Sequence, residues 1–507
     1  MFESFQCGAA RIIAKLTVQN NRLTAYLFGS RAERYTVDPE GMTLLFNEHE
    51  AILESPVKPK PSKPSCTSDR VLKPRGKRKP LPADLPRVKK TVDLAVNQKL
   101  CETHGVELVK IGETRTEKLD IEPAKAFVTD YVVSRYKCPC CEDLNVIHAN
   151  LPDEPISKSV ASSGLLAYIA TQKYVDGLPL SRQVRIFERA SIDLNRTTLA
   201  RWMIKAANLA SPLISLLHED LIESNVIHAD ETHVQVLNEP NKSPESKSYM
   251  WCLARSGESP IILYKYYDNR SKNAASELLH GFQGTLVADA YKVYDSLQKS
   301  MDFKLAGCFA HARRRFWEAE KFAKKASSRT SASLAASALT YIRQLYAIEE
   351  SIRELSADEI LRVRQKSSLP ILDKFFDWLI VQKNQVLPNS PTGKAIGYAI
   401  SNWSKLIEFS LDGHVPIDNN FMERHIRPFT IGRKAWLFSS TQAGADASAT
   451  LYSLVESAKA NRIEPFDYLK LIFKELPSVE NLIDLEKLLP YNAARHFPLR
   501  PYIPSKK

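Results

Sequence analysis

Three acidic residues lie in segments that are typical of a phosphoryl-transfer site. Asp230 interrupts one apolar, strand-like run, Asp289 ends another, and Glu423 lies in a short segment that favours a helix. Carboxylates packed together repel one another and take up protons. A pair of Mg²⁺ or Mn²⁺ ions held ~3.5–4 Å apart would keep them ionised and hold both the attacking and the leaving oxygen. The alternative is that each acid is simply solvated at a strand end.

Two further carboxylates remain alternatives. Glu231 follows Asp230 directly and competes with it for a role in the site. Glu456, on a later helical stretch, is the fallback for the third acid. The local contexts of Asp230, Asp289 and Glu423 taken together favour the first assignment.

A mixed sheet is the element that must position these acids. Short runs rich in β-branched and aromatic residues predict strands over 225–230, 249–254, 261–267 and 284–289. Helices are expected over 274–280 and from residue 291, and this order suits a mixed sheet with helices packed on it. Residues 318–410 are rich in Ala, Lys and Leu, so they predict a run of helices inserted between Asp289 and Glu423.

A zinc site is predicted upstream of these elements. Cys101 and His104 form one pair with a two-residue gap, and Cys138 with Cys141 forms another. Two such pairs on small β turns suit a tetrahedral structural Zn²⁺, with Cys140 as the spare ligand. The alternative is a set of unrelated thiols and a surface histidine.

A basic, proline-rich linker precedes the zinc site. Residues 56–90 hold twelve Lys or Arg against two Asp, a net charge of +10 out of the +12 of the whole chain. The eight prolines of this stretch prevent a helix or a central strand, so it is predicted to be an extended tether. Its phosphate-contacting candidates are Lys73, Arg75, Lys77, Arg78 and Lys79. The alternative is a linker kept soluble by its charge; a partner rich in phosphate fits better.

Two helical segments complete the organisation. Apolar residues at three- and four-residue steps over 9–28 predict a leucine-zipper-like helix with Asn20 as its one core polar residue, or else a helix docked on its own core. Residues 180–187, a turn at 191–194 and a capped segment from Asn195 give the outline of a helix-turn-helix, which ordinary helical bundles also show.

The bulk composition is that of a globular, multidomain protein. Over 507 residues the hydrophobic content is 44% and the charged content 25%. The chain shows no apolar run of the ~20 residues that a membrane span needs, and its first residues do not predict a signal peptide. Eight cysteines, three of them crowded at 138–141, favour a reducing compartment. We therefore expect a cytoplasmic protein with no membrane partner.

Several motifs resemble those of the insertion-sequence-66 family of transposases, from about Leu16 to the C-terminal region. They are Leu27–Glu33, Pro80–Arg87, Gly307–Arg314, Ile417–Arg424 and Leu451–Asn461. The resemblance implies an α/β multidomain protein with an RNase H-like catalytic core of the DDE type, preceded by a zinc-binding domain and an N-terminal leucine-zipper segment. By position, Asp230, Asp289 and Glu423 would be its metal-binding triad. The first zinc pair departs from the family's Cys-x-x-Cys because its second residue is His104.

These observations predict six regions. They are an N-terminal helical segment (1–55), a basic linker (56–92), a zinc-binding domain (93–155), a helical region that could read DNA (156–224), an RNase H-like DDE domain (225–440) with a helical insertion (318–415), and a C-terminal helical region with its tail (441–507).

The expected function is cleavage and strand transfer of DNA at the inverted repeats of a bacterial mobile element. The active form is expected to be a homo-oligomer associated with the nucleoid, with or without accessory proteins. The alternatives are a zinc-dependent DNA-binding protein with an inactive core, and a nuclease without joining activity. Further phosphate contacts are expected from Arg313, Arg314, Arg424, Arg427 and Arg433, some of which could instead pair with nearby acids.

Overall fold

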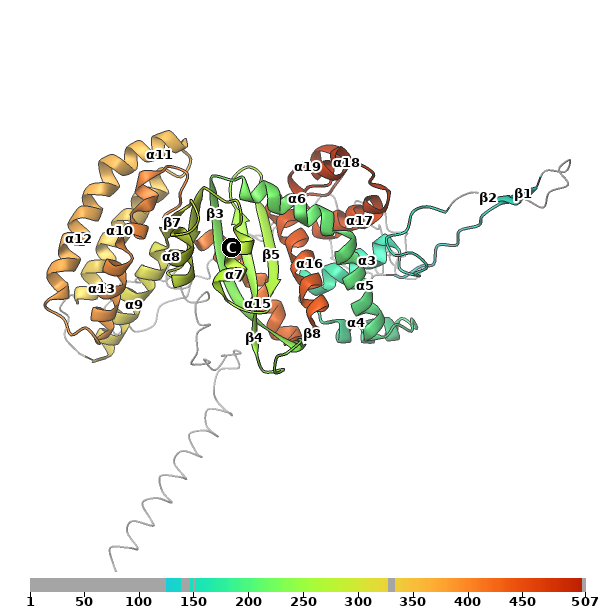
Figure 1. The fold of residues 1–507 in the computed structure, drawn as a ribbon, viewed down its shortest axis with the longest axis horizontal. Helices are drawn as coiled ribbons and strands as arrows, with labels where there is room; N and C mark the ends of the chain where they lie inside the picture. The colour runs from blue at the N-terminus through green and yellow to red at the C-terminus, as the bar shows by residue number, and fades with distance from the viewer. Residues whose placement is uncertain (1–124, 138–145, 149–150, 327–332, 504–507) are drawn as a thin grey trace, which may run out of the picture. The chain divides into compact units, whose positions relative to one another are not determined.

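The structure is a computed structural model that describes residues 125–137, 146–148, 151–326 and 333–503 (Figure 1). Most of the predicted N-terminal features lie outside these residues: the leucine-zipper-like helix, the basic linker, and the zinc ligands Cys101, His104, Cys138 and Cys141. The described residues fall into two compact units. One comprises 154–184 and 195–503, and the other comprises the described parts of 125–153 together with 185–194.

The smaller unit contains a short antiparallel hairpin. Strand β1 (Arg135–Lys137) pairs with β2 (Val146–His148), with Tyr136 opposite Ile147. In sequence the two strands bracket the predicted zinc ligands Cys138 and Cys141. The second half of helix α4 (Leu180–Arg189) also belongs to this unit. The turn after α4 contains Ser191 with a φ of 60°.

The larger unit is built on a mixed sheet with the strand order β5-β4-β3-β6-β7. Strands β3 (Val226–Asn238), β4 (Lys247–Arg255) and β5 (Ile261–Tyr267) are antiparallel neighbours. Strands β6 (Thr285–Ala288) and β7 (Lys304–Gly307) run parallel to β3, and β8 (Ser439–Thr441) pairs with its far end. The mixed sheet expected from the sequence is therefore confirmed.

Two details of the sheet differ from the sequence prediction. The strand expected to end at Asp230 continues to Asn238, so Asp230 lies within β3 rather than at its end. Residues 304–307 form a strand, whereas the sequence suggested only a segment leading into a helix. The four residues of β7 include no β-branched or aromatic side chain that would predict a strand, and β7 is defined by its parallel partner β6.

A glycine allows β6 to enter the sheet beside β3. A Cβ on Gly284 would lie 2.3 Å from the backbone oxygen of Asn225, so any other residue would push the two strands apart. At the same point the backbone N–H of Thr285 donates to Asn225 O at 2.8 Å. The four residues of β6 are all buried, as expected of a central parallel strand covered on both faces.

Helix α16 (Gln442–Ala460) protects the outer edge of the sheet. On edge strand β5, the backbone N–H groups of Ile262 and Tyr264 have no strand among the described residues to pair with at this edge. They donate instead to the hydroxyls of Ser457 and Ser453, at 2.9 and 2.8 Å. These two serines are four residues apart and therefore share one face of the helix. An open strand edge would otherwise invite pairing with another chain.

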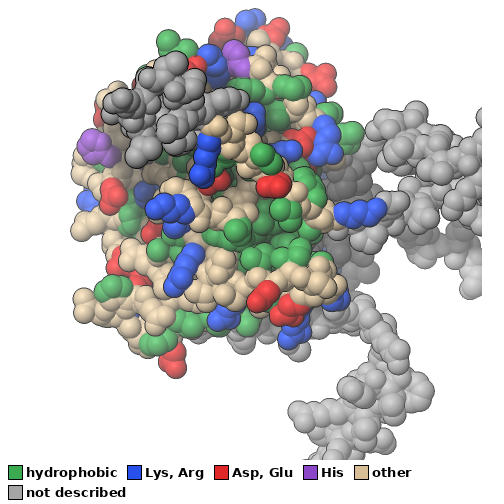
Figure 2. Space-filling model, turned by 90° about the vertical axis from the view of Figure 1, so that its right-hand side faces the viewer, with side chains coloured by type: hydrophobic (Ala, Val, Ile, Leu, Met, Phe, Trp, Pro, Cys, Tyr) green, Lys and Arg blue, Asp and Glu red, His purple; other side chains and the backbone are tan. Residues whose placement is uncertain are grey.

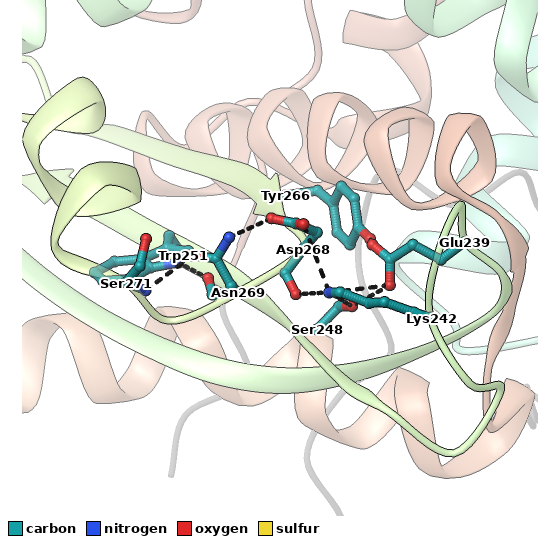
Figure 3. Close-up of polar contacts among 8 residues, drawn as sticks. All are labelled: Glu239, Lys242, Ser248, Trp251, Tyr266, Asp268, Asn269 and Ser271. Carbon is teal, nitrogen blue, oxygen red and sulfur yellow. Dashed lines mark hydrogen bonds and ion pairs between the residues drawn. The ribbon is translucent and has the colours of Figure 1, made fainter.

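The β3–β4 turn is fixed around a buried acid just after β3, Glu239. Its carboxylate accepts hydrogen bonds from Ser248 (2.6 Å) and from the hydroxyl of Tyr266, and Lys242 lies 3.4 Å away (Figure 3). Burial raises the pKa of Glu239, but these donors and the Lys242 charge outweigh burial and leave the pKa below its ordinary value. This acid is fully satisfied by the fold.

A helical insertion lies on the β7 side of the sheet, between α9 (Phe309–Ala326) and α15 (Asn420–Trp436) (Figure 1). Its helices are α10 (Leu334–Ser351), α11 (Ala357–Val363), α12 (Leu369–Lys383), α13 (Pro391–Ser401) and α14 (Trp403–Leu406). A π-helical turn (Arg364–Ser368) joins α11 to α12, and a 3₁₀ turn (Glu408–Leu411) follows α14. Aromatic side chains such as Phe316, Phe375 and Trp403 fill its core.

The π-helical turn anchors the return of the chain to the sheet. Arg364 is 3% exposed and pairs with Glu349, with their closest atoms 2.6 Å apart. The same guanidinium donates to the carbonyls of Phe409, Asp412 and Val415 at 2.7–2.9 Å. One buried cation thus holds the loop that precedes Asp418 and α15.

Other helices of the larger unit pack on the side of the sheet opposite the insertion, around α16 (Figure 1), whereas α7 (Lys272–Leu278) follows β5 and contacts α8 (Lys292–Gln298). The helices around α16 are α3 (Ser163–Tyr174), α5 (Arg196–Leu209), α6 (Ser211–Ile222), α17 (Pro465–Glu475), α18 (Leu482–Lys487) and α19 (Pro490–His496). Helix α5 begins as predicted, because the side chain of Asn195 accepts the N–H of Thr198 at 2.8 Å. The helices on either side of the predicted turn are confirmed.

The surface carries mixed charge. On the face shown in Figure 2, Lys and Arg side chains alternate with acidic and hydrophobic ones instead of gathering in one place. This agrees with a sequence in which the 56–90 linker holds most of the net positive charge. Among the described helices, none has both the length and the apolar character needed to cross a membrane.

Candidate active site

Asp230 projects from the middle of the sheet. In the antiparallel register it lies opposite Cys252, which in turn lies opposite Tyr264, so the three side chains share one face. Glu231, the next residue, points to the other face. Asp230 Oδ1 accepts the backbone N–H of Glu231 at 2.8 Å, which fixes the carboxylate against the strand.

Asp289 lies beside Asp230 because of the parallel pairing of β3 with β6. His228 is in register with Val287, so two residues further along each chain Asp230 and Asp289 reach the same level. The Asp289 carboxylate accepts the N–H of Tyr291 at 3.0 Å, where the chain turns into α8 (Lys292–Gln298). The two aspartates predicted from distant motifs are thus brought to adjacent positions.

Glu423 approaches from the first turn of α15, which packs against β3. Its side chain is buried, with 8% exposed. The charge of Glu423, like that of Asp289, raises the pKa of Asp230. The structure therefore gathers all three predicted acids, from β3, from the end of β6 and from α15.

Asn419, at the start of α15, locks this arrangement. Its backbone N–H donates to Cys308 Sγ at 3.2 Å, and its side-chain amide donates to Ala229 O at 3.0 Å. Its Oδ1 lies 2.8 Å from Nδ1 of His228. Since Asn419 is 1% exposed, these contacts tie the N-terminus of α15 to the residue before Asp230. No role for Asn419 could be predicted from the sequence, because its partners are more than 100 residues away.

The electrostatics of the cluster are those of crowded like charges. Burial raises the pKa of Asp230 well above its ordinary value, and the charges of Glu231, Asp289 and Glu423 raise it further. Only the backbone N–H of Glu231 opposes the shift. Without a compensating cation, such a carboxylate holds a proton more tightly than an exposed one.

The chemistry of the donors fits a divalent cation. Asp230, Asp289 and Glu423 supply only carboxylate oxygens, the ligands that Mg²⁺ and Mn²⁺ prefer. A bound cation would remove the mutual repulsion that raises the pKa of Asp230. The three residues therefore suit the metal predicted from the sequence.

Glu231 is engaged on the opposite face of the sheet. It forms an ion pair with Arg270, and Tyr294 donates to it at 3.2 Å. Arg270 in turn stacks over the ring of Tyr291, 3.6 Å from its centroid. Burial raises the pKa of Glu231 to about 7 although Arg270 opposes the rise. These contacts favour a positioning role for Glu231.

Glu456, the fallback acid, is likewise engaged elsewhere. It lies on α16, 1% exposed, with Lys459 at 2.7 Å and His425 at 3.6 Å. A carboxylate neutralised in this way is typical of a structural ion pair. The geometry favours Glu423 as the third acid.

Two residues beside Glu423 were not singled out from the sequence as ligands. Cys308 directly precedes α9 and His311 lies in its first turn. The ligand atoms of Cys308, His311 and Glu423 all lie within 4.8 Å of one another. The available signal was the segment Gly307–Arg314, which was noted as a motif without a metal role.

The predicted phosphate-binding arginines fall into different environments. Arg424 is exposed and, with Arg353, His228 and Phe421, lines a cavity of about 310 Å³. Arg313 is half-buried near the Tyr346 ring; burial raises the pKa of Asp418, and the charge of Arg313 is one of the effects that oppose this rise.

The other three arginines are less accessible. Arg427 is half-buried and Arg314 is 9% exposed. Arg433 is 8% exposed and donates to Thr232 Oγ1 at 3.0 Å and to His233 O. Burial lowers its pKa to about 10. A phosphate contact from Arg433 would break these bonds, so a structural role is favoured for it.

Fold and site together define a mixed α/β protein in which one sheet and one helix gather the carboxylates that metal-dependent phosphoryl transfer requires. The family model described as "Transposase IS66 family" matches residues 158–447. Models described as "Transposase C of IS166 homeodomain", "zinc-finger binding domain of transposase IS66" and "IS66 C-terminal element" match 15–89, 98–142 and 453–491. The chain belongs to the IS66 family of transposases, and the resemblance identified in the sequence is confirmed.

Similar proteins occur in Sinorhizobium fredii. The chain is 31% identical to the uncharacterized protein y4qI over 500 residues, which cover 95% of this chain and 89% of the relative. It is 29% identical to the uncharacterized protein y4jD over 503 residues, which cover 95% of each chain. The similarity thus extends over nearly the full length of these proteins.

Proposed function

We propose that the protein is an active DDE transposase that binds the terminal inverted repeats of an insertion sequence, cuts the DNA strands there and joins the ends to target DNA. The observation that carries this proposal is the convergence of Asp230, Asp289 and Glu423, which raises the pKa of Asp230. We assign these three residues as the catalytic, metal-binding triad. Membership of the IS66 transposase family supports the same assignment.

The sheet supports an RNase H-like core. Three antiparallel strands (β3, β4, β5) are followed by two further strands (β6, β7) parallel to the first, in the order β5-β4-β3-β6-β7. The acids lie on the central strand, at the end of its parallel neighbour, and on a helix that packs on the central strand. In this interpretation the helices of 333–411 are an insertion before the last acid.

The proposed chemistry is two phosphoryl transfers. In the first, water attacks the scissile phosphate and the 3′-oxygen leaves as a 3′-hydroxyl; in the second, this 3′-hydroxyl attacks a target phosphate and the 3′-oxygen of the target strand leaves. When bound, Mg²⁺ or Mn²⁺ supplies charge neutralisation and lowers the pKa of the attacking oxygen's proton. The protein's own part is to hold Asp230 and Asp289 level on rigid strands and to fix Glu423 against them through Asn419. Positioning of this kind supplies much of the catalysis of phosphoryl transfer.

Contacts to DNA are assigned to three parts of the chain. The 56–90 linker carries the largest concentration of positive charge, with Lys73, Arg75, Lys77, Arg78 and Lys79 at its centre. Arg424 and Arg313 are the nearest candidates beside the triad. A zinc-binding domain with Cys101, His104, Cys138 and Cys141 as ligands would hold the end-binding region together, in agreement with the zinc-finger model over 98–142.

The linker assignment has a quantitative test. If six of its basic groups meet duplex phosphates, log affinity falls against log salt with a slope of about −5. Deleting residues 56–90 should flatten this slope. An unchanged slope would move the contacts to another part of the chain.

Partners and location follow from the same proposal. Cutting two ends and joining them to one target favours a homo-oligomer, with accessory proteins of the element as further partners. A chromosomal DNA substrate places the protein in the bacterial cytoplasm, associated with the nucleoid when bound.

The decisive experiment incubates purified protein with DNA that contains the element's ends, a target plasmid and Mg²⁺. Joined products that disappear in Asp230→Asn support the transposase. Cleavage without joining would support a nuclease, and binding alone a DNA-binding regulator with an inactive core. If Asp230→Asn joined DNA as well as the wild type, the triad assignment would be wrong.

A further inference from the structure

Beside the triad lies a group of ligands unlike the all-oxygen set of the aspartates. Cys308 Sγ, an imidazole nitrogen of His311 and a carboxylate oxygen of Glu423 all lie within 4.8 Å of one another. The Nε2 atom of His311 is 3.8 Å from Oε1 of Glu423. Thiolate and imidazole are the ligands that select zinc and related ions over Mg²⁺.

The local fold brings the first two ligands together. Cys308 directly precedes α9, and His311 is three residues later, so both lie over the first helical turn on the same side. The two-residue gap is the spacing found in tight zinc-binding pairs. Glu423 completes the group from α15, more than 100 residues away.

Backbone amides around Cys308 are arranged for a thiolate. Its Sγ accepts the N–H of Asn419 at 3.2 Å and also a backbone hydrogen bond from His311. Burial raises the pKa of the Cys308 thiol, the charges of Asp418 and Glu423 raise it further, and these two N–H groups oppose the rise. A coordinating cation displaces the thiol proton outright, and hydrogen bonds to the sulfur then stabilise the ligand.

The group can accept an ion with little rearrangement. Bond lengths of about 2.0–2.3 Å to Zn²⁺ put tetrahedral ligands about 3.5 Å apart. The ligand atoms, now within 4.8 Å of one another, therefore need to approach by about 1.3 Å at most. Cys308 is 1% exposed, whereas the His311 side chain is 24% exposed. The imidazole edge therefore provides the entry route from solvent.

We propose that Cys308, His311 and Glu423 form a site for Zn²⁺ or a similar borderline divalent cation, with water as the fourth ligand. Glu423 is then shared between this site and the acidic cluster. An ion held by Cys308 and His311 withdraws Glu423 from Asp230 and Asp289, so zinc inhibits the magnesium-dependent reaction. The binding does not depend on the proposed function, but its effect on activity rests on it.

The binding test uses Co²⁺ as the probe, because a thiolate bound to Co²⁺ gives a charge-transfer band in the near ultraviolet. Full-length protein saturated with one equivalent of Zn²⁺ is titrated with Co²⁺. The wild type should gain this band together with visible bands of tetrahedral cobalt. Cys308→Ser should lose the charge-transfer band, while Cys252→Ser, which changes the other buried cysteine of the described region, should keep it.

A second variant, His311→Gln, keeps the proposal testable if Cys308→Ser does not fold. His311→Gln leaves the sulfur and its backbone donors in place, so the band should persist with cobalt affinity at least ~10-fold weaker. Thermal unfolding of each variant shows whether it is folded. Equal charge-transfer bands in the wild type and in folded Cys308→Ser would overturn the site, as would unchanged affinity in His311→Gln.

The activity arm measures zinc inhibition of end joining in Mg²⁺, relative to each protein's own zinc-free rate. Zinc should inhibit the wild type and Cys252→Ser, and Cys308→Ser should need at least ~10-fold more zinc. Cobalt binding without zinc inhibition would overturn the withdrawal of Glu423. If no joining occurs under any condition, the proposed function fails while the cobalt titration still decides the site.

Discussion

Two acids, the half-buried Asp230 within strand β3 and the buried Glu239 just after its end, behave in opposite ways. Glu239 accepts hydrogen bonds from Ser248 and Tyr266 beside Lys242, and its pKa falls (Figure 3). Asp230 faces Asp289 and Glu423, and its pKa rises. Burial raises the pKa in both places; the neighbouring carboxylates of Asp230 add to this rise, whereas the donors and the cation around Glu239 outweigh it. A satisfied acid stabilises the fold, whereas a crowded one is prepared to bind a cation.

The largest expected effect is on DNA joining, which should depend on Asp230 and not on Glu239. Asp230→Asn and Glu423→Gln should each lower DNA joining by about 10³-fold or more, because metal-assisted charge stabilisation is worth several kcal/mol. Glu239→Gln, the matched control, should retain joining. Rates of strand transfer measured with each purified variant provide the check. A loss of joining in a folded Glu239→Gln variant would break the comparison.

Asn419→Ala should affect both stability and activity. It leaves Ala229 O and His228 Nδ1 without their partner, at roughly 1–3 kcal/mol for each buried group. It also frees the start of α15, which carries Glu423. DNA joining should therefore fall about 10–100-fold, the usual effect of removing a residue that supports a metal ligand. Denaturant unfolding and joining assays measure the two effects.

Asn402→Ala is the control for Asn419→Ala, because its side chain bonds to residues nearby in the sequence: its amide donates to Tyr398 O and Ser401, and its Oδ1 accepts from Lys405. It should leave joining intact. Wild-type activity in Asn419→Ala would mean that α15 is held by other contacts.

The two acids should also give opposite pH dependences of stability in the absence of divalent metal. The folded state binds the Asp230 proton more tightly than the unfolded state, so this residue costs stability as pH rises above 3.8 toward its raised pKa. The free energy of unfolding of Asp230→Asn, relative to the wild type, should therefore increase as pH rises. Glu239 has a lowered pKa, so its contribution is present above 4.5 and disappears as pH falls through the lowered value.

Free energies of unfolding from pH 3 to pH 8 would measure both slopes. Slopes of the same sign for Asp230→Asn and Glu239→Gln, each relative to the wild type, would contradict the contrast between the sites. Repeating the series with Mg²⁺ should reduce the Asp230 effect, because the cation compensates the crowded charges.

The smallest effect distinguishes an exposed arginine from a buried one. Arg424→Ala should weaken DNA binding and reduce the salt slope by about 1, as expected for one lost phosphate contact. Arg433→Ala should leave the salt slope unchanged and lower stability, because Thr232 and His233 lose their donor. Binding isotherms at several salt concentrations separate the two. A reduced slope for Arg433→Ala would assign a phosphate contact to it after all.

Much of the core could be predicted from the residues. The runs 249–254 and 261–267 alternate or cluster apolar residues strongly enough to predict β4 and β5, and Asn195 marks the start of α5. Strand β7 could not be predicted, since Lys304–Gly307 contains no β-branched or aromatic residue and is defined by its partner β6. The length of β3 was underestimated because the polar stretch Asp230–His233 interrupts its apolar pattern.

The site could likewise be predicted only where the signal is local in the sequence. Asp230, Asp289 and Glu423 could be proposed because acids next to apolar runs are visible in the sequence. The roles of Asn419, His228 and Cys308 could not, because each depends on a partner at least 100 residues away. The contacts of Arg433 with β3 and of Glu456 with Lys459 and His425 could not be seen in the sequence either, and they favour structural roles for these two residues.

The sequence by itself determined the kind of chemistry, since residue types fix which ions and phosphates a site can attract. It also determined the family, because ordered motifs are read along the chain. Only the tertiary structure decided which acids are crowded and which are satisfied. That difference arises from the charges and donors within a few ångströms, and the parallel register of β3 with β6 and the docking of α15 bring these together from three distant segments.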